Sequence, residues 1–178
     1  MNVEAVLQEL LDKQAIQELI ARYSRTLDWL DDEGQAGCYW PDAAIDYGFF
    51  KGTAAEFVPV VMAVERSTGR RWHLLAPRSV KLTSATTAEG ECYGVALGFR
   101  REGEEPYKGN MYGGRYLDTY EKREGEWRIS SSLDSPSNTW TPQGRQGSKL
   151  RRARMMSMPL NFSFPFSSKS GVFMMASS

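Results

Sequence analysis

The chain has 178 residues with 22 basic and 22 acidic side chains, so its formal net charge is zero and gives no global attraction to nucleic acid or an anionic membrane. A hydrophobic share of 41% and a charged share of 25% are those of an ordinary globular protein, without a stretch of membrane-spanning length. One histidine and two cysteines are too few for a zinc site or a disulfide framework, so we expect no metal, no cofactor and reduced thiols. The first residues are acidic and amphipathic rather than basic and then apolar, which predicts a cytoplasmic protein rather than an exported one.

The first thirty residues predict helix with a phase break. One apolar stripe is followed by a second stripe that is rotated to roughly the opposite side of the helix. The first stripe consists of Val3, Val6, Leu7, Leu10 and Leu11, and the second of Ile16, Leu19, Ile20, Tyr23 and Leu27. Asp12 lies between the stripes and suits an N-cap, so we expect two helices, about 3–11 and 13–29, with a bend between them.

The next segment mixes short elements. Asp31 or Asp32 is expected to cap a third, short helix that ends before Pro41. Residues 43–50 predict a short strand or a hairpin, which Lys51 and Gly52 punctuate. Thr53 is expected to cap a helix that runs to about residues 65–67 and is stopped by Gly69.

Four strand-like segments follow, at about 71–83, 89–101, 109–122 and 126–134, with turn signals at 101–103 and 123–125. Helices first and strands afterwards predict an α+β fold with a largely antiparallel sheet. We interpret the serine run 130–132 as sheet surface.

The segment 91–99 has two different faces. Alternation places large side chains on one side and only small residues on the other, namely Cys92, Gly94, Ala96 and Gly98. Such a face indicates either close packing of a helix or a neighbouring subunit, or a ligand cavity. We expect both cysteines, Cys38 and Cys92, to be small apolar fillers rather than nucleophiles.

The chain divides into a domain, residues 1–141, and a tail, residues 142–178. The tail has a short basic run, which we interpret as a solvated face rather than a nucleic-acid site, followed by apolar stretches rich in Met, Phe and Pro. It is too apolar for a typical disordered segment, so we expect it to pack on the domain or across a subunit interface.

His73 is the only histidine, and therefore the only candidate for acid–base chemistry by an imidazole near neutral pH. Strand alternation groups it with Leu75, Pro77 and Ser79, away from Trp72 and Leu74, although Pro77 indicates an edge or a bulge at which the alternation can end. The alternative is a partly buried histidine satisfied by a backbone carbonyl.

Asp28 lies near the C-terminal end of its predicted helix, where the helix dipole disfavours a negative charge. A carboxylate beside an imidazole would fix the tautomer of the ring and stabilise its charged form; the alternative is a solvated residue at a helix end. Tyr23 precedes Asp28 by five residues, about 140° round the helix, so both could line a wide cavity without touching. A simple core role for Tyr23 stays open.

Several of these segments together resemble a known family. Residues 12–23, 27–28 and 39–43 resemble the opening of SnoaL-like proteins of the nuclear transport factor 2-like superfamily, and residues 113–116 and 120–130 resemble its last two strands. The resemblance covers about residues 8–141. It implies a cone-shaped α+β barrel, in which a strongly curved, mixed, mostly antiparallel sheet and N-terminal helices packed on it enclose a pocket.

Within this superfamily the chain is most similar to cofactor-free Asp–His lyases, such as dehydrochlorinase, scytalone dehydratase and bile-acid 7α-dehydratase. Asp28 and His73 stand at the places of the Asp–His pair, and Tyr23 stands at the place of the bile-acid enzyme's tyrosine. Two features differ: Ser132 stands where the dehydrochlorinase has an arginine, and the second catalytic histidine of scytalone dehydratase is absent. The substrate therefore stays open.

The resemblance implies a cofactor-independent lyase of the dehydratase or elimination type, or an isomerase, that acts on a small hydrophobic cyclic substrate. His73 would be the general base, Asp28 would orient and charge-stabilise it, and Tyr23 would polarise an oxygen or protonate a departing hydroxyl. The alternatives are a non-catalytic ligand-binding or scaffold protein resembling the β subunit of ring-hydroxylating dioxygenases, and a polyketide-type cyclase or monooxygenase. The resemblance also implies a homo-oligomer, with a trimer favoured over a dimer.

Overall fold

The computed structural model describes residues 2–99, 109–134 and 158–160. The helices are α1 Val3–Trp29, α2 Asp32–Ala36 and α3 Ala54–Ser67. The strands are β1 Tyr39–Asp46, β2 Lys51–Thr53, β3 Arg70–Leu82, β4 Thr87–Phe99, β5 Gly109–Arg123, β6 Glu126–Asp134 and β7 Met158–Leu160. The predicted α+β class is confirmed.

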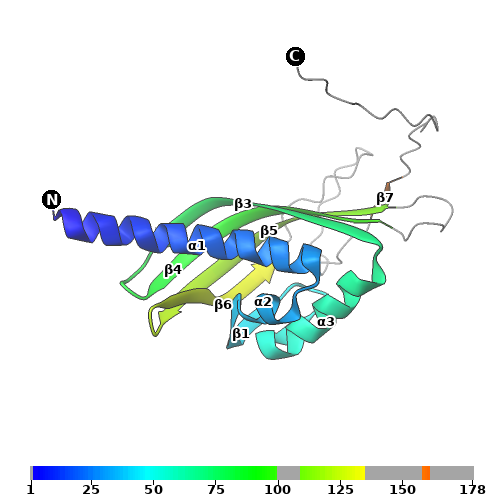
Figure 1. Ribbon diagram of the computed structural model, residues 1–178, viewed down its shortest axis with the longest axis horizontal. Helices are drawn as coiled ribbons and strands as arrows, with labels where there is room; N and C mark the ends of the chain where they lie inside the picture. The colour runs from blue at the N-terminus through cyan, green and yellow to red at the C-terminus, as the bar shows by residue number, and fades with distance from the viewer. Residues whose placement is uncertain (1, 100–108, 135–157, 161–178) are drawn as a thin grey trace, which may run out of the picture.

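The strands form one mixed sheet in the order β2-β1-β6-β5-β4-β3, and β7 pairs with β5 in addition. β1 pairs with β6 in parallel, and the other described pairs are antiparallel. The expectation of a cone-shaped barrel is wrong for the described strands: the sheet is neither closed nor strongly curled (Figure 1). The two ends of the strand order are β2, which has three residues, and β3, and these strands do not pair with each other.

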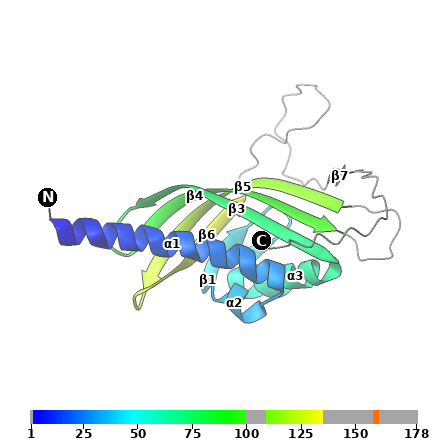
Figure 2. The ribbon, with the colours of Figure 1, turned by 45° about the horizontal axis from the view of Figure 1, so that its top comes forward.

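Helix α1 lies across one face of the sheet, and α2 and α3 gather near its C-terminal end (Figures 1 and 2). The second predicted stripe, from Ile16 to Leu27, faces the sheet and is buried in the core. The first stripe, from Val3 to Leu11, is exposed, and the N-terminal turns of α1 project past the strands.

The predicted bend at Asp12 is wrong, because α1 is one continuous helix that Asn2 caps. Asp12 does not accept backbone N–H groups. Its carboxylate instead accepts hydrogen bonds from Trp127 Nε1 and Lys122 Nζ, each at 2.8 Å. This buried carboxylate ties the middle of α1 to β5 and β6, so the change of apolar face needs no break in the helix.

The other predicted caps are confirmed. The side chain of Asp31 accepts from the N–H of Gly34 at 2.9 Å at the start of α2. Thr53 forms a capping box with Glu56 at the start of α3. The region 43–50 is part of a hairpin, but Lys51 and Gly52 lie inside β2 rather than in its turn.

The four predicted strands correspond to β3, β4, β5 and β6 with shifts of a few residues at their ends. Residues 100–101 of the second predicted strand lie outside the described residues. So does the tail 142–178, except for residues 158–160, which form β7 and pair with residues 109–111. Of the helices within the described ranges, none combines the length and the apolar character that crossing a bilayer requires.

Candidate functional site

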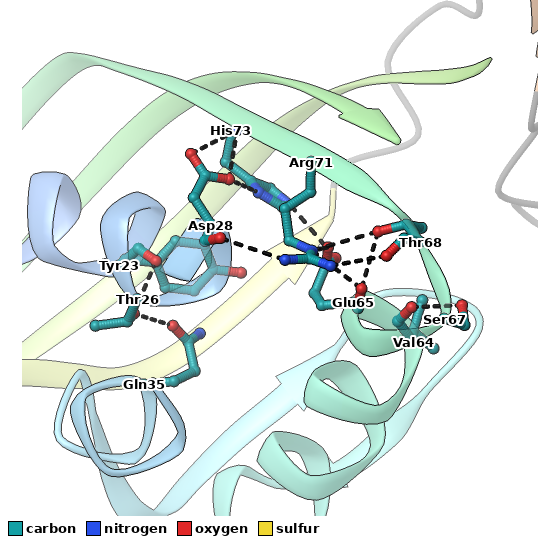
Figure 3. A network of polar contacts seen from close by, with 10 residues as sticks. All are labelled: Tyr23, Thr26, Asp28, Gln35, Val64, Glu65, Ser67, Thr68, Arg71 and His73. Carbon is teal, nitrogen blue, oxygen red and sulfur yellow. Dashed lines mark hydrogen bonds and ion pairs between the residues drawn. The ribbon is translucent and has the colours of Figure 1, made fainter. Parts of the chain in front are cut away.

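The structure brings Asp28 and His73 together at the C-terminal end of α1 (Figure 3). His73 Nδ1 lies 2.8 Å from Asp28 Oδ1, and the backbone N–H of His73 donates to the same oxygen at 3.0 Å. Because an ionised carboxylate only accepts, Nδ1 is the donor in this contact. His73 and Leu75 face the inner side of β3, whereas Trp72 and Leu74 are more than half exposed, which confirms the predicted alternation as far as Leu75. Pro77 and Ser79, which were predicted on the same face, are exposed, and the strand register shifts between them, so the prediction is wrong there.

A second carboxylate faces the other nitrogen of the ring. Glu65 Oε1, from the last turn of α3, lies 3.5 Å from His73 Nε2, and both side chains are largely buried. Sequence reasoning missed Glu65. The signal that singled out Asp28 applies to it as well, since an acid in the last turn of a helix is disfavoured by the helix dipole.

Arg71 connects the ends of the two helices around this site (Figure 3). Its guanidinium donates to the carbonyl oxygens of Glu65 at 3.0 Å and Thr68 at 2.8 Å, near the end of α3, and to that of Asp28 at 3.4 Å. It also lies 3.7 Å from Glu65 Oε2. Arg71 therefore satisfies helix-end carbonyls and holds Glu65 beside the imidazole.

The two carboxylates decide the charge of His73. Burial lowers the pKa of this histidine, but the contacts with Glu65 and Asp28 outweigh burial, so that the pKa is raised above its ordinary value of 6.5. A neutral ring with its proton on Nδ1 would turn a lone pair toward Glu65, whereas the imidazolium offers an N–H to each carboxylate. The structure thus favours an imidazolium between two acids.

Tyr23 lies elsewhere on α1, in the core. Its ring packs edge-on against Tyr39, with centroids 6.0 Å apart, and burial raises the pKa of its hydroxyl well above 10. No contact between Tyr23 and Asp28 or His73 is present, which agrees with the predicted angle between them. Tyr23 both packs in the core and borders a cavity.

That cavity lies between α1 and the sheet and has a volume of about 10 Å³, which is room for about one water molecule. Its lining residues are Ile20, Tyr23, Tyr47, Leu75, Cys92, Tyr116, Asp118, Ile129 and Ser132. Of the small face of β4, Cys92 borders this cavity. Gly94 is closely packed instead, since an added Cβ there would lie 2.5 Å from the side chain of Leu75. Cys38 and Cys92 are both buried free thiols, in line with their expected role as fillers.

One wall of the cavity carries a buried polar row that the sequence reasoning missed. Ser132 is buried, so its interpretation as sheet surface is wrong. Tyr47 donates to Ser132 at 2.8 Å, and Ser132 donates to Asp118 at 2.5 Å, while Tyr120 donates to the other oxygen of Asp118 at 3.0 Å. Burial raises the pKa of Asp118 to about 6. The available signal was an acid on the inward face of β5, two residues from each of Tyr116 and Tyr120.

Within the described residues there is no group of three or more His, Cys, Asp or Glu side chains arranged to hold a metal ion. The site around His73 is an imidazole between two acids, and none of the side chains of His73, Asp28 and Glu65 lines the small cavity with the polar wall.

The profile of the SnoaL-like domain family matches residues 8–132. No curated protein matches the chain.

Among solved structures, a protein provisionally assigned as a scytalone dehydratase from Novosphingobium aromaticivorans has 21% identity and a TM-score of 0.67, over 84% of this chain and 99% of that one. A type 2 hexachlorocyclohexane dehydrochlorinase has 20% identity and a TM-score of 0.65, over 90% of this chain and 98% of that one. A protein provisionally assigned as an aromatic ring hydroxylase from N. aromaticivorans has 20% identity and a TM-score of 0.61, over 70% and 88% of the two chains. At these identities the likeness shows a shared fold.

Proposed function

The chain belongs to the SnoaL-like domain family, and on that basis we propose that it is a cofactor-independent lyase of the elimination type, or a related isomerase, acting on a small hydrophobic cyclic substrate. The observation that carries this proposal is the 2.8 Å contact between Asp28 Oδ1 and His73 Nδ1. A carboxylate bonded to Nδ1 makes Nε2 the atom that can take up a proton once the contact between Nε2 and Glu65 is broken.

In the proposed reaction, His73 Nε2 removes a proton from a ring carbon that a neighbouring carbonyl or leaving group makes acidic. The C–H electron pair forms the new double bond, and the C–O bond to the departing hydroxyl breaks. The imidazolium then returns its proton to the hydroxyl, so that the products are an unsaturated ring and water and the protein is unchanged. In an isomerisation the proton returns to a different carbon instead.

Asp28 and Glu65 have different tasks in this scheme. Asp28 stays bonded to Nδ1 and stabilises the imidazolium as it forms. Glu65 occupies the position beside Nε2, so the substrate has to displace it. Displacement removes one of the two acids that raise the pKa of His73, and this favours the neutral ring at the moment when a base is needed.

Tyr23 is proposed as a hydrogen-bond donor to a substrate oxygen. Its hydroxyl has a strongly raised pKa and so keeps its proton, which suits polarisation of an oxygen better than release of a proton. The cavity that Tyr23 lines has room for a substituent only, so the ring itself would lie on the His73 side, in the space that Glu65 vacates.

The proposal is tested with β-hydroxy cyclic ketones, beginning with 3-hydroxycyclohexanone, whose elimination to cyclohexenone is followed by ultraviolet absorbance. We expect the wild-type protein to catalyse elimination from at least one member of a series of one to three rings. His73→Gln should lower the rate by about 100-fold or more, since a placed base contributes about 10² to 10⁴ in rate. Undiminished elimination by His73→Gln would refute the proposal.

One observation favours the non-catalytic alternative: Glu65 already faces the nitrogen that a base would use. A ligand-binding or scaffold protein would keep this contact in the presence of ligand. Co-purification with a larger iron-containing chain, together with no elimination from any member of the series, would support that alternative.

We further propose that the chain forms a homo-oligomer. The outer face of β3 and β4 exposes neighbouring large apolar side chains, among them Leu74 at 55% and its cross-strand partner Val95 at 40%. Exposed apolar patches of this kind are typical of subunit contacts. Light scattering on the full chain tests this, and a chain ending near Gly147 tests the part that the tail plays.

A further inference from the structure

The cavity between α1 and the sheet is polar on one side only. Asp118, Ser132 and Tyr47 contribute to that side, and apolar side chains such as Ile20 and Leu75 contribute to the rest. None of these polar groups belongs to the proposed acid–base site around His73, so they need an explanation of their own.

The hydrogen bonds of this polar row converge on the carboxylate of Asp118. The hydroxyl of Tyr47 donates to Ser132, Ser132 donates to Asp118 Oδ1, and Tyr120 donates to Asp118 Oδ2. Each of these three hydroxyl groups therefore already uses its one proton in a hydrogen bond within the row. The unused capacity of the row is acceptor capacity, because an ionised carboxylate has about four acceptor positions and Asp118 uses two.

A buried carboxylate with two donors is poorly compensated for the water it has lost. The raised pKa of Asp118 agrees with this, since burial is the largest cause of the shift and the bonds from Ser132 and Tyr120 only partly oppose it. A third donor at the carboxylate would stabilise the charge further. The cavity has room for one atom group of the size of a water molecule.

We propose that Asp118 accepts a hydrogen bond from a hydroxyl group that the ligand keeps, so that the cavity selects hydroxylated rings over rings that carry only a ketone, an ether or a halogen. This inference rests on the proposed function for the ring-shaped ligand. It identifies the substrate oxygen that Tyr23 contacts as the oxygen of this hydroxyl, since Tyr23 and Asp118 line one cavity with room for one group, and it places that hydroxyl on the α1–sheet side of the site, away from Nε2 of His73.

Binding is measured without turnover, with cyclohexanol, methoxycyclohexane and cyclohexanone as probes and the backbone amide signals of Leu75, Asp118 and Ser132 as NMR reporters. The wild-type protein should bind cyclohexanol about tenfold or more tightly than the other two probes, because a hydrogen bond to a charged group is lost with each of them. Equal binding of cyclohexanol and methoxycyclohexane would overturn the proposal, and would leave the cavity as a site for structural water.

Asp118→Asn supplies the sharper test. The amide offers an N–H that a carboxylate lacks, so the preference should shift from cyclohexanol toward cyclohexanone. Tyr120→Phe is the matched control: it also removes a partner of Asp118, but Tyr120 is not part of the cavity wall, so the preference for cyclohexanol should remain. If Asp118→Asn folds and still prefers cyclohexanol, the proposal is wrong; if it does not fold, the comparison of probes on the wild-type protein decides.

The same assay on His73→Gln separates this inference from the proposed function. Loss of elimination with the cyclohexanol preference retained supports both. Elimination by the wild-type protein without any preference for cyclohexanol removes the Asp118 subsite and leaves the lyase proposal in place.

Discussion

Asp28 binds His73 twice, once through the ring nitrogen Nδ1 at 2.8 Å and once through the backbone N–H at 3.0 Å. The two bonds fix the side chain and the strand that carries it relative to the end of α1. An interaction that only neutralised a surface histidine would not need the backbone bond. The arrangement instead resembles a support that holds an imidazole in one orientation.

Asp28→Asn should lower the pKa of His73, because the amide stabilises the imidazolium less than the carboxylate does. Since His73 is the only histidine, its ring signal in an NMR titration is unambiguous. On any substrate found, the same variant should lose about 100- to 10,000-fold in rate through the wrong tautomer. Asp42→Asn, which removes a carboxylate paired with Arg123, is the control and should change neither quantity. An unchanged pKa of His73 in Asp28→Asn would contradict the contact.

Glu65→Gln should also lower the pKa of His73, since Glu65 is the second acid that raises it. The measurement is the same NMR titration, with Glu89→Gln, an exposed acid on β4, as the control. Addition of a ligand to the wild-type protein should produce a shift in the same direction if it displaces Glu65. A pKa that is insensitive to Glu65→Gln would mean that Glu65 does not face Nε2 in solution.

Asp118 should make stability depend on pH. Its carboxyl has a pKa of about 6 in the folded protein against 3.8 in the unfolded chain, so the folded state holds more protons between these values. The free energy of unfolding therefore falls as the pH rises from about 4 to 6, by about 3 kcal/mol in total. His73 does not contribute to this slope, because its raised pKa gives stability that is complete below 6.5.

Denaturant unfolding of wild type and Asp118→Asn across this pH range checks the slope. The amide of Asp118→Asn does not titrate, so the free energy of unfolding of the wild type should fall toward that of the variant, or below it, as the pH rises. Carboxylates with a lowered pKa, such as Asp12, change the free energy of unfolding at lower pH, and they do so equally in both proteins. Parallel curves for the two proteins would contradict the burial of an ionisable Asp118.

Asp12→Ala should destabilise the fold by about 3 kcal/mol, because it leaves the buried indole N–H of Trp127 and the partly buried ammonium group of Lys122 without their acceptor. Glu9→Gln is the matched control on the same helix: Glu9 forms only an exposed pair with Lys13, and its loss should cost about 0.5 kcal/mol or less. Chemical denaturation measures both. Equal effects would show that Asp12 does not hold α1 against the sheet.

Local patterns predicted most elements of this fold. The caps Asp31 and Thr53 and the alternation over residues 72–75 depend on neighbouring residues, and the structure confirms them. The prediction of Asp12 as an N-cap was wrong because its partners, Lys122 and Trp127, are more than a hundred residues away in the chain. A capping aspartate and a buried aspartate with distant partners cannot be distinguished by the residues next to them in the sequence.

The residues of the site also divide into those that a local pattern indicates and those that depend on partners far away in the chain. The contact between Asp28 and His73 was predicted because each residue carries a local signal, a charge at the wrong helix end and a lone imidazole, and because the family resemblance pairs their two positions. Glu65 carries the same signal as Asp28, but nothing in the sequence paired it with His73. Ser132 was placed on the surface because a short serine run suggests solvent. Inside the fold its hydroxyl bonds to Tyr47, which follows β1, and to Asp118 of β5.

We propose that His73 moves a proton at a ring carbon. The most direct measurement is the uptake of deuterium from D2O at the carbon next to the carbonyl of the best-bound β-hydroxy cyclic ketone, compared between wild type and His73→Gln by NMR. We expect uptake well above the buffer rate in the wild type and a decrease of about 100-fold or more in His73→Gln. Equal uptake in the two proteins would contradict the claim.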